Sequence, residues 1–143
     1  MVSAIKVLVA DDNRDAAESL GILLSISGYR VLVAHSGFEA LELALREHPD
    51  VLILDIGMPV LSGYEVARGI RQQDWGKHAL LLAISGWDQQ RDRDASSAAG
   101  FDVHLSKPAR PESVEELLAE FSTRRQARRE LAPQSEGRPL PSA

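Results

Sequence analysis

The 143-residue sequence contains no cysteine. A chain without thiols has no disulfide framework, no thiolate metal site and no cysteine nucleophile. The sequence also lacks an apolar run near the ~20 residues that a membrane-spanning helix needs. Its first residues, MVSAIK, lack the charged and then apolar layout of a signal peptide. These absences predict a reduced, cytoplasmic protein with no membrane span.

Positive charge is scarce over most of the chain. Residues 1–123 carry 11 Lys and Arg against 19 Asp and Glu, whereas residues 124–143 carry 5 Arg against 2 Glu. A nucleic-acid-binding domain needs a basic surface, so the acidic body argues against that class. The composition, 44% hydrophobic and 26% charged, fits one globular domain. The length leaves no room for a second full domain.

Short apolar segments alternate with longer amphipathic ones along the chain. The pattern predicts strands near 5–10, 30–34, 50–54, 79–84 and 102–105, and helices near 14–27, 37–46, 62–72, 87–99 and 111–123. Five successive strand–helix units predict an α/β fold, a doubly wound parallel sheet with helices on both faces.

Two helix starts carry a capping-box pattern. Ser36 with Glu39, and Ser62 with Glu65, have the spacing in which Ser accepts from the third helical N–H and Glu reaches back to the cap. Pro111 fits the first turn of the last helix.

The apolar stripe of that last helix stops after Phe121, because its helical continuation falls on Arg125 and Arg128. We therefore expect a domain over residues 1–123. We expect residues 124–143 to form a basic, proline-containing, disordered tail.

Reactive side chains follow four of the expected strands. Asp11 and Asp12 follow the first strand, Asp55 the third, Ser85 the fourth and Lys107 the fifth. In parallel sheets ligands bind outside the carboxyl ends of the strands. We therefore expect these five side chains to share one site.

Three carboxylates in one pocket oppose one another's ionisation, and the single positive charge of Lys107 offsets only one of their negative charges. A divalent cation resolves this conflict, and Mg²⁺ favours hard oxygen ligands such as one or two carboxylates plus a phosphate oxygen. Lys107 and the Ser85 hydroxyl then face the phosphoryl oxygens. Phosphoryl transfer needs mainly positioning and charge stabilisation, and this set supplies both.

Four segments together resemble the receiver domain of two-component response regulators: VADDN at 9–13, LDIGMPVLSG at 54–63, ISG at 84–86 and LSKP at 105–108. The resemblance covers about residues 4–122. It implies the flavodoxin-like (βα)5 fold with sheet order 2-1-3-4-5, an order that the alternation alone does not give.

The resemblance also implies roles for the site residues. Asp55 resembles the phosphoacceptor, which takes a phosphoryl group from a sensor histidine kinase or a histidine phosphotransfer protein. Mg²⁺, or Mn²⁺ in its place, is expected on Asp12 and Asp55, on Asp11 mostly through water, and on the backbone carbonyl of Gly57. Lys107 is expected to contact the phosphoryl group.

Activation in this family moves the residue at Ser85 toward the phosphoryl group and changes the surface of the fourth helix, fifth strand and fifth helix. His104 stands where the family often has a Tyr or Phe switch residue. The bond before Pro108 resembles one that is cis in the family. No DNA-binding or catalytic domain follows residue 123, so we expect the output to be a contact with a downstream protein. We also expect a monomer or weak dimer. We expect catalysis only of its own phosphorylation and dephosphorylation.

Other readings of the same residues remain open. A phosphorelay intermediate or hybrid-kinase-type receiver would pass the phosphoryl group onward. A Mg²⁺-dependent phosphohydrolase typically has a second acid two residues after its nucleophile, where this chain has Gly57. A dinucleotide-binding domain needs a glycine cradle after the first strand, which is absent here. A degenerate receiver would lack part of the acid, hydroxyl and lysine set. His104 also fits a simple packing role.

Overall fold

The computed structural model describes residues 4–86 and 90–131, with only the backbone for residues 90–92. Its elements are β1 (Lys6–Ala10), α1 (Arg14–Ile26), β2 (Arg30–Ala34), α2 (Gly37–Glu47), β3 (Val51–Asp55), α3 (Gly63–Arg71), the 3-10 helix η1 (Trp75–His78), β4 (Leu80–Ser85), α4 (Gln90–Ala99), β5 (Val103–Ser106) and α5 (Pro111–Leu131). The chain divides after Pro111 into two units, which are described separately. The start expected for the fourth helix, at residue 87, lies outside the described residues.

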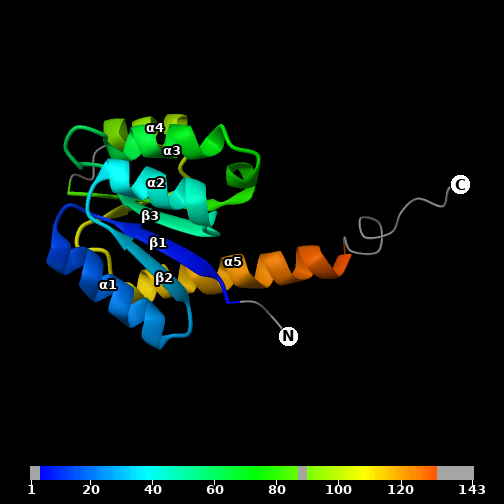
Figure 1. Ribbon diagram of the computed structural model, residues 1–143. Coiled ribbons are helices and arrows are strands. Elements are labelled where there is room, and N and C mark those ends of the chain that lie inside the picture. Colours follow the sequence, from blue (N-terminus) through cyan, green and yellow to red (C-terminus); the bar gives the residue numbers. More distant parts are fainter. Residues whose placement is uncertain (1–3, 87–89, 132–143) are drawn as a thin grey trace, which may run out of the picture. The chain divides into compact units, whose positions relative to one another are not determined.

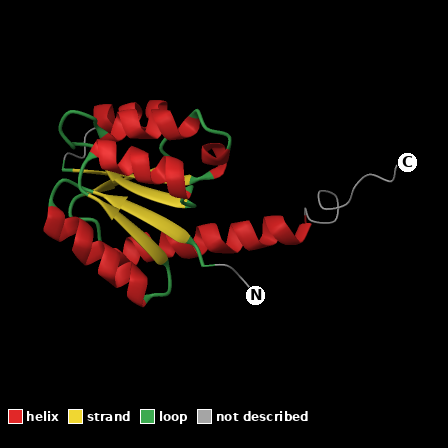
Figure 2. Ribbon diagram, in the orientation of Figure 1, coloured by secondary structure: helices red, strands yellow, loops and turns green. Residues whose placement is uncertain are grey.

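The five strands form one parallel sheet in the order β2-β1-β3-β4-β5, which confirms the expected fold (Figures 1 and 2). Helix α1 lies on one face of the sheet, and α2, α3 and α4 lie on the other (Figure 1). Because all strands run the same way, their carboxyl ends meet at one edge, which we call the carboxyl edge. The opposite edge is called the amino edge.

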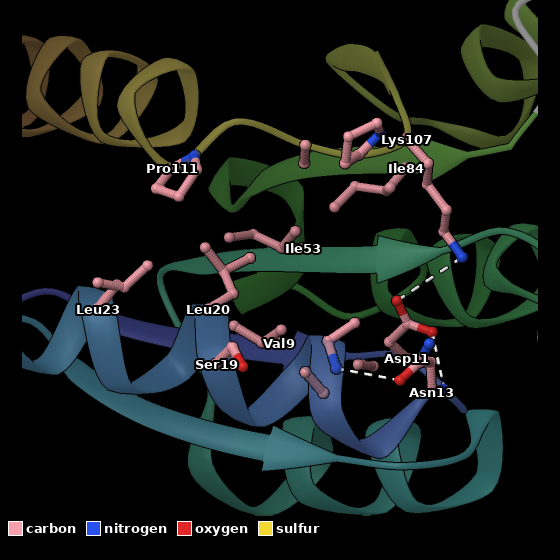
Figure 3. Close-up of a pocket in the computed structure, with 15 residues that line it drawn as sticks. Val9, Asp11, Asn13, Ser19, Leu20, Leu23, Ile53, Ile84, Lys107 and Pro111 are labelled. Carbon is pink, nitrogen blue, oxygen red and sulfur yellow. Dashed lines mark hydrogen bonds and ion pairs between the residues drawn. The ribbon is translucent and has the colours of Figure 1, made fainter.

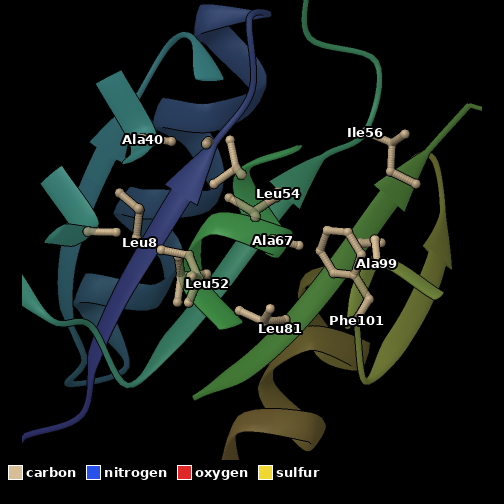
Figure 4. Close-up of a cluster of buried hydrophobic side chains, with 14 of the residues drawn as sticks. Leu8, Ala40, Leu52, Leu54, Ile56, Ala67, Leu81, Ala99 and Phe101 are labelled. Carbon is tan, nitrogen blue, oxygen red and sulfur yellow. The ribbon is translucent and has the colours of Figure 1, made fainter. Parts of the chain in front are cut away.

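One sheet face packs against α2 and α3 and holds the main hydrophobic core. Leu8, Leu52, Leu54 and Leu81 point into it and are fully buried, and Phe101 closes it near α4 (Figure 4). Alternate residues of a strand point to opposite faces, so these leucines share one face. Truncating a buried Leu to Ala typically lowers the free energy of unfolding by about 2–5 kcal/mol. The core therefore fixes the strands that carry the carboxyl edge.

The other sheet face is lined by β-branched side chains. Val9 and Ile53 come from β1 and β3, and Ile84 comes from β4; their exposed fractions are all below a tenth. Helix α1 contributes Ala17 and Leu24 to the buried residues.

The capping pattern is confirmed at α3 and altered at α2. Ser62 Oγ accepts from the Glu65 N–H, and Glu65 Oε1 accepts from the Ser62 N–H at 2.9 Å. At α2 the Ser36 hydroxyl also accepts from the third helical N–H. The acid three residues on, however, accepts from the His35 N–H at 2.7 Å. It thereby fixes the exit of β2 rather than the cap itself.

The expectation that the last helix ends near residue 123 is wrong, because α5 continues to Leu131. The end of the apolar stripe does not mark the end of the helix. Residues 124–131 are mostly good helix formers with no proline or glycine, so the backbone continues after the stripe has ended. An ion pair between Arg124 and Glu120 at 3.7 Å has helical i, i+4 spacing. Residues 124–131 of the tail that was expected to be disordered are therefore helical, and its residues 132–143 lie outside the described part.

Helix η1 was not foreseen. Trp75 within it stacks on His48, with ring centroids 4.5 Å apart and planes 10° from parallel. Within the described ranges, no helix has the length and apolar character needed to cross a membrane.

Candidate phosphoacceptor site

Asp55 is the last residue of β3 and only 4% of it is exposed. Its Oδ1 accepts a hydrogen bond from the Gly57 N–H at 3.0 Å. The next residue, Ile56, donates its N–H to the Ile84 carbonyl at 2.9 Å, so β3 remains tied to β4 just past the carboxylate. The carboxylate is therefore held by backbone on both sides at the carboxyl edge.

Asp11 and Asp12 follow β1 at the same edge. Asp11 is 7% exposed, and its Oδ1 accepts from the Asn13 N–H at 3.0 Å. Asn13 in turn caps α1 by accepting from the Ala16 N–H at 3.1 Å. The start of α1 thus orients Asp11 inward, while Asp12 is exposed.

The structure brings the three carboxylates together. One oxygen each from Asp11, Asp12 and Asp55 lies within 4.8 Å of the others. Lys107 follows β5, and its Nζ lies 3.2 Å from Asp55 Oδ2. The same Nζ lies 3.7 Å from Asp11 Oδ2 (Figure 3). With all groups ionised the local charge is −2, which is the deficit that a divalent cation removes.

The charges shift the ionisation of two of these groups. Burial raises the pKa of Asp11 to about 6, and the nearby Asp55 adds to the rise despite the Asn13 hydrogen bond. Burial by itself lowers the pKa of Lys107, but its contacts with Asp55 and Asp11 outweigh burial and hold that pKa above its usual value. Lys107 is therefore a fixed cation, whereas Asp11 carries a charge that its surroundings oppose.

Ser85 is the last residue of β4 and is 5% exposed. It follows Ile84, which pairs with Asp55 across the two strands, so Ser85 lies one position beyond the phosphoacceptor candidate. Its carbonyl accepts from the Lys107 N–H at 2.8 Å, which ties the two site strands together. The Lys107–Pro108 peptide bond is cis. The sequence placed Asp55 and Ser85 after their strands, whereas both end them.

His104 is separate from the carboxylate group and contacts α4 instead. Its Nδ1 lies 2.8 Å from the hydroxyl oxygen of Ser96, a residue that is only 1% exposed. Strand β5 and helix α4 are thus joined by a polar contact beside the site. Ser96 was not singled out from the sequence, because only the fold brings it to His104.

Two glycines also escaped the sequence reasoning. A Cβ on Gly63 would lie 2.7 Å from the Asp55 carbonyl oxygen, and a Cβ on Gly37 would overlap the Leu61 carbonyl. Both residues let a helix start approach the backbone around the phosphoacceptor candidate. A capping-box pattern in the sequence predicts where the helix starts, but it does not show that the helix start packs closely against another part of the backbone.

The loop after Asp55 contains a strained residue. Val60 has φ 69° and is 85% exposed. A β-branched residue in the left-handed region is a steric outlier. The strain lies five residues from Asp55, at the carboxyl edge.

The sequence of the chain is similar to those of known proteins. The profile of the response regulator receiver domain matches residues 7–119. The response regulator MprA of Mycobacterium ulcerans is 42% identical over 116 residues, which cover 81% of this chain and 48% of that protein. The chain thus spans about half the length of the curated relatives it matches.

Two solved structures are similar as well. The Vibrio cholerae chemotaxis protein CheY4 is 30% identical with a TM-score of 0.79, covering 83% of this chain and 99% of that one. The receiver domain of the sensor histidine kinase PA1611 from Pseudomonas aeruginosa, solved with a magnesium ion coordinated in its active site cleft, is 28% identical with a TM-score of 0.75. That match covers 83% of this chain and 98% of the PA1611 domain.

Proposed function

Because the chain belongs to the response regulator receiver domain family, we propose that Asp55 accepts a phosphoryl group from a phosphohistidine. The donor is a sensor histidine kinase or a histidine phosphotransfer protein. One observation carries the proposal: a nearly buried carboxylate, Asp55, lies beside two other carboxylates and 3.2 Å from the Lys107 ammonium. Buried carboxylates that outnumber the nearby cations are costly unless a ligand such as a metal ion balances their charge.

In the proposed reaction a carboxylate oxygen of Asp55 attacks the phosphorus, and the P–N bond to the donor imidazole breaks. The imidazole leaves with the electron pair and takes up a proton, and Asp55 becomes an acyl phosphate. The Gly57 N–H holds Oδ1 in place during the attack. When Asp55 becomes an acyl phosphate its carboxylate no longer carries the charge that pairs with Lys107. The Lys107 ammonium is then positioned to contact a phosphoryl oxygen and stabilise its negative charge.

The donor set suits Mg²⁺ or Mn²⁺. Three carboxylate oxygens within 4.8 Å of one another and a local charge of −2 match hard divalent cations. We propose Asp12 and Asp55 as direct ligands, Asp11 as a ligand through water, and the Gly57 carbonyl as a further ligand. The bound cation would offset the carboxylate charge and polarise a phosphoryl oxygen. The magnesium described for the PA1611 receiver supports this assignment.

We propose that the phosphorylated state is read through α4 and β5 by a downstream protein. Ser85 lies one position beyond Asp55, and its carbonyl bonds the Lys107 N–H. His104 on β5 contacts Ser96 on α4. A movement of Ser85 toward the phosphoryl group would therefore shift Lys107 and the end of β5, the strand that contacts α4 through His104.

The test is phosphotransfer from an autophosphorylated histidine kinase, or from phosphoramidate, followed by intact mass and phosphate-affinity electrophoresis. Wild type should gain one phosphoryl group in the presence of Mg²⁺, and EDTA should prevent this. Asp55→Asn should gain none. Asp74→Asn, which changes a fully exposed carboxylate, is the matched control and should behave as wild type. Equal labelling of the Asp55 variant would refute the proposal.

Onward transfer is a second candidate function, because the PA1611 relative is the receiver of a sensor histidine kinase. If the chain is a relay intermediate, the phosphorylated protein should pass its label to a purified histidine phosphotransfer protein faster than it loses the label to water. A protein that only binds its target would keep the label.

A further inference from the structure

A cavity of about 530 Å³ lies between α1 and the sheet face opposite the main core (Figure 3). Val9, Ile53 and Ile84 line it from the sheet, and Leu20 and Leu23 line it from the helix. Pockets that hold small molecules usually have volumes of about 300–1,000 Å³ and mostly apolar walls. This cavity has both properties.

Short side chains form part of the cavity wall. Ala16 and Ala17 face it from α1, and Ala109 faces it from the segment after β5. Leu24 of α1 is fully buried, so the helix is firmly seated on the sheet despite the gap beside it. All the residues that line the cavity belong to the unit that ends at Pro111.

One end of the cavity is charged. Asp11 and Lys107 line that end, and Figure 3 shows the lysine directed at Asp11. Asp12 and Asp55 do not line the cavity but lie beside Asp11, so three carboxylates lie near one ammonium at this end. This excess of negative charge repels an anionic ligand and attracts a cationic one.

The distance between the two ends sets the shape of a ligand. Asn13, which caps α1, and Leu23 within that helix both line the cavity. They are ten residues apart, which corresponds to about 15 Å of helix. A ligand that fits has a cationic head at the carboxylates and an apolar body that extends toward Leu23.

We propose that this cavity binds an apolar primary amine, with the ammonium beside Asp11 and the apolar chain along Leu20 and Ile53. The ammonium occupies the position that a divalent cation needs, so the amine and Mg²⁺ exclude one another. If Asp55 is the phosphoacceptor proposed above, the amine also suppresses its phosphorylation. That consequence rests on the proposed function, whereas the binding itself does not.

The test titrates octylamine, octan-1-ol and octanoate, each below its micellar concentration, into unphosphorylated, metal-free ¹⁵N-labelled protein followed by NMR. Octylamine should bind about tenfold more tightly than octan-1-ol, and octanoate should bind weakest. Mg²⁺ should weaken octylamine binding at least tenfold and leave octan-1-ol unaffected. Equal affinities for the amine and the alcohol, or no effect of Mg²⁺ on the amine, would overturn the proposal.

Variants place the ligand. Leu20→Ser should weaken both octylamine and octan-1-ol about tenfold, and Leu23→Ser is the replacement variant at the exposed end if the first does not fold. Ile22→Ser changes an apolar residue of α1 that is 61% exposed and outside the cavity, and should change neither affinity. Asp11→Asn should remove most of the preference for amine over alcohol.

Unchanged binding by folded Leu20→Ser and Leu23→Ser would exclude the cavity as the site. The binding titration needs no phosphoryl donor, so a failure of Asp55 phosphorylation leaves its outcome intact. Conversely, a failure to bind octylamine leaves the phosphotransfer assay unaffected. The two proposals can therefore fail separately.

Discussion

The amino and carboxyl edges of the sheet differ in whether their charged side chains are paired. At the amino edge the Arg71 guanidinium donates to the carbonyl oxygens of Gly100, Gly76 and Ala79 at 2.8–2.9 Å and pairs with Asp102 at 2.9 Å. At the carboxyl edge three carboxylates share one lysine. The charged groups at the amino edge of the sheet are therefore paired, whereas the carboxylates at its carboxyl edge outnumber the one cation beside them.

The difference shows which edge is built for stability and which for a ligand. Asp102 Oδ2 also accepts from the Leu81 N–H, and Lys6 Nζ bonds both the Glu47 side chain and its carbonyl. Fully paired groups have no remaining capacity for a ligand. Unbalanced carboxylates raise the free energy of the folded state until a cation arrives.

Breaking the satisfied edge should have the largest effect on stability. Arg71→Met leaves three carbonyl groups and Asp102 without their cation, and should lower the free energy of unfolding by about 3 kcal/mol. Urea unfolding measures this. Arg68→Met, on the exposed side of the same helix, is the matched control and should change it by less than about 0.5 kcal/mol.

Supplying a cation to the unbalanced edge should have the next largest effect. Mg²⁺ at 100 times its dissociation constant should raise the free energy of unfolding of the wild type by about 2.7 kcal/mol. Asp12→Asn should lose most of this response, and Arg71→Met should retain it from a lower starting point. An equal response in the Asp12 variant would place the cation elsewhere.

Removing one charge from the unbalanced edge should stabilise the metal-free protein. The raised pKa of Asp11, about 6, means that its contribution to stability is present below its ordinary pKa near 4 and is lost as the pH rises through 6. Asp11→Asn should therefore raise the free energy of unfolding at pH 8 by about 2 kcal/mol. The difference from wild type should shrink as the pH falls from 7 to 5 in urea titrations with EDTA.

Relieving strain at the carboxyl edge should have a smaller effect. Val60→Asn places a residue that tolerates the left-handed region at φ 69° and should raise the free energy of unfolding by about 1 kcal/mol. Val60→Thr keeps the branched Cβ while adding polarity, so it should give no comparable gain. Equal gains from both variants would attribute the effect to polarity rather than strain.

The smallest effect should come from Glu47 at the amino edge, and its sign should be opposite to that of Asp11. The contact with Lys6 lowers the pKa of Glu47, so its contribution is present at neutral pH and is lost as the pH falls through that lowered pKa. Glu47→Gln should destabilise the protein slightly at pH 7, and the loss should vanish in acid. A stabilising Glu47→Gln variant would contradict the comparison of the two edges.

Much of the fold was predictable because its signals are local. Apolar runs and amphipathic segments gave the strands and helices to within a few residues, and the parallel arrangement placed Asp11, Asp55 and Lys107 at one edge. The end of α5 was predicted wrongly because a burial pattern was used where helix propensity decided. Helix η1 was missed because four residues are too few to show a period.

The sequence by itself determined which chemical groups meet at the carboxyl edge, since the parallel arrangement of the strands and the side chain at the end of each follow from patterns along the chain. Only the tertiary structure decided how those groups are balanced. The 3.2 Å contact of Lys107 with Asp55 and the cavity beside α1 join residues distant in sequence. The contact of Ser96 with His104 joins α4 to the strand that follows it. Distances between such residues depend on how helices pack on the sheet, and packing depends on the volumes of all side chains together.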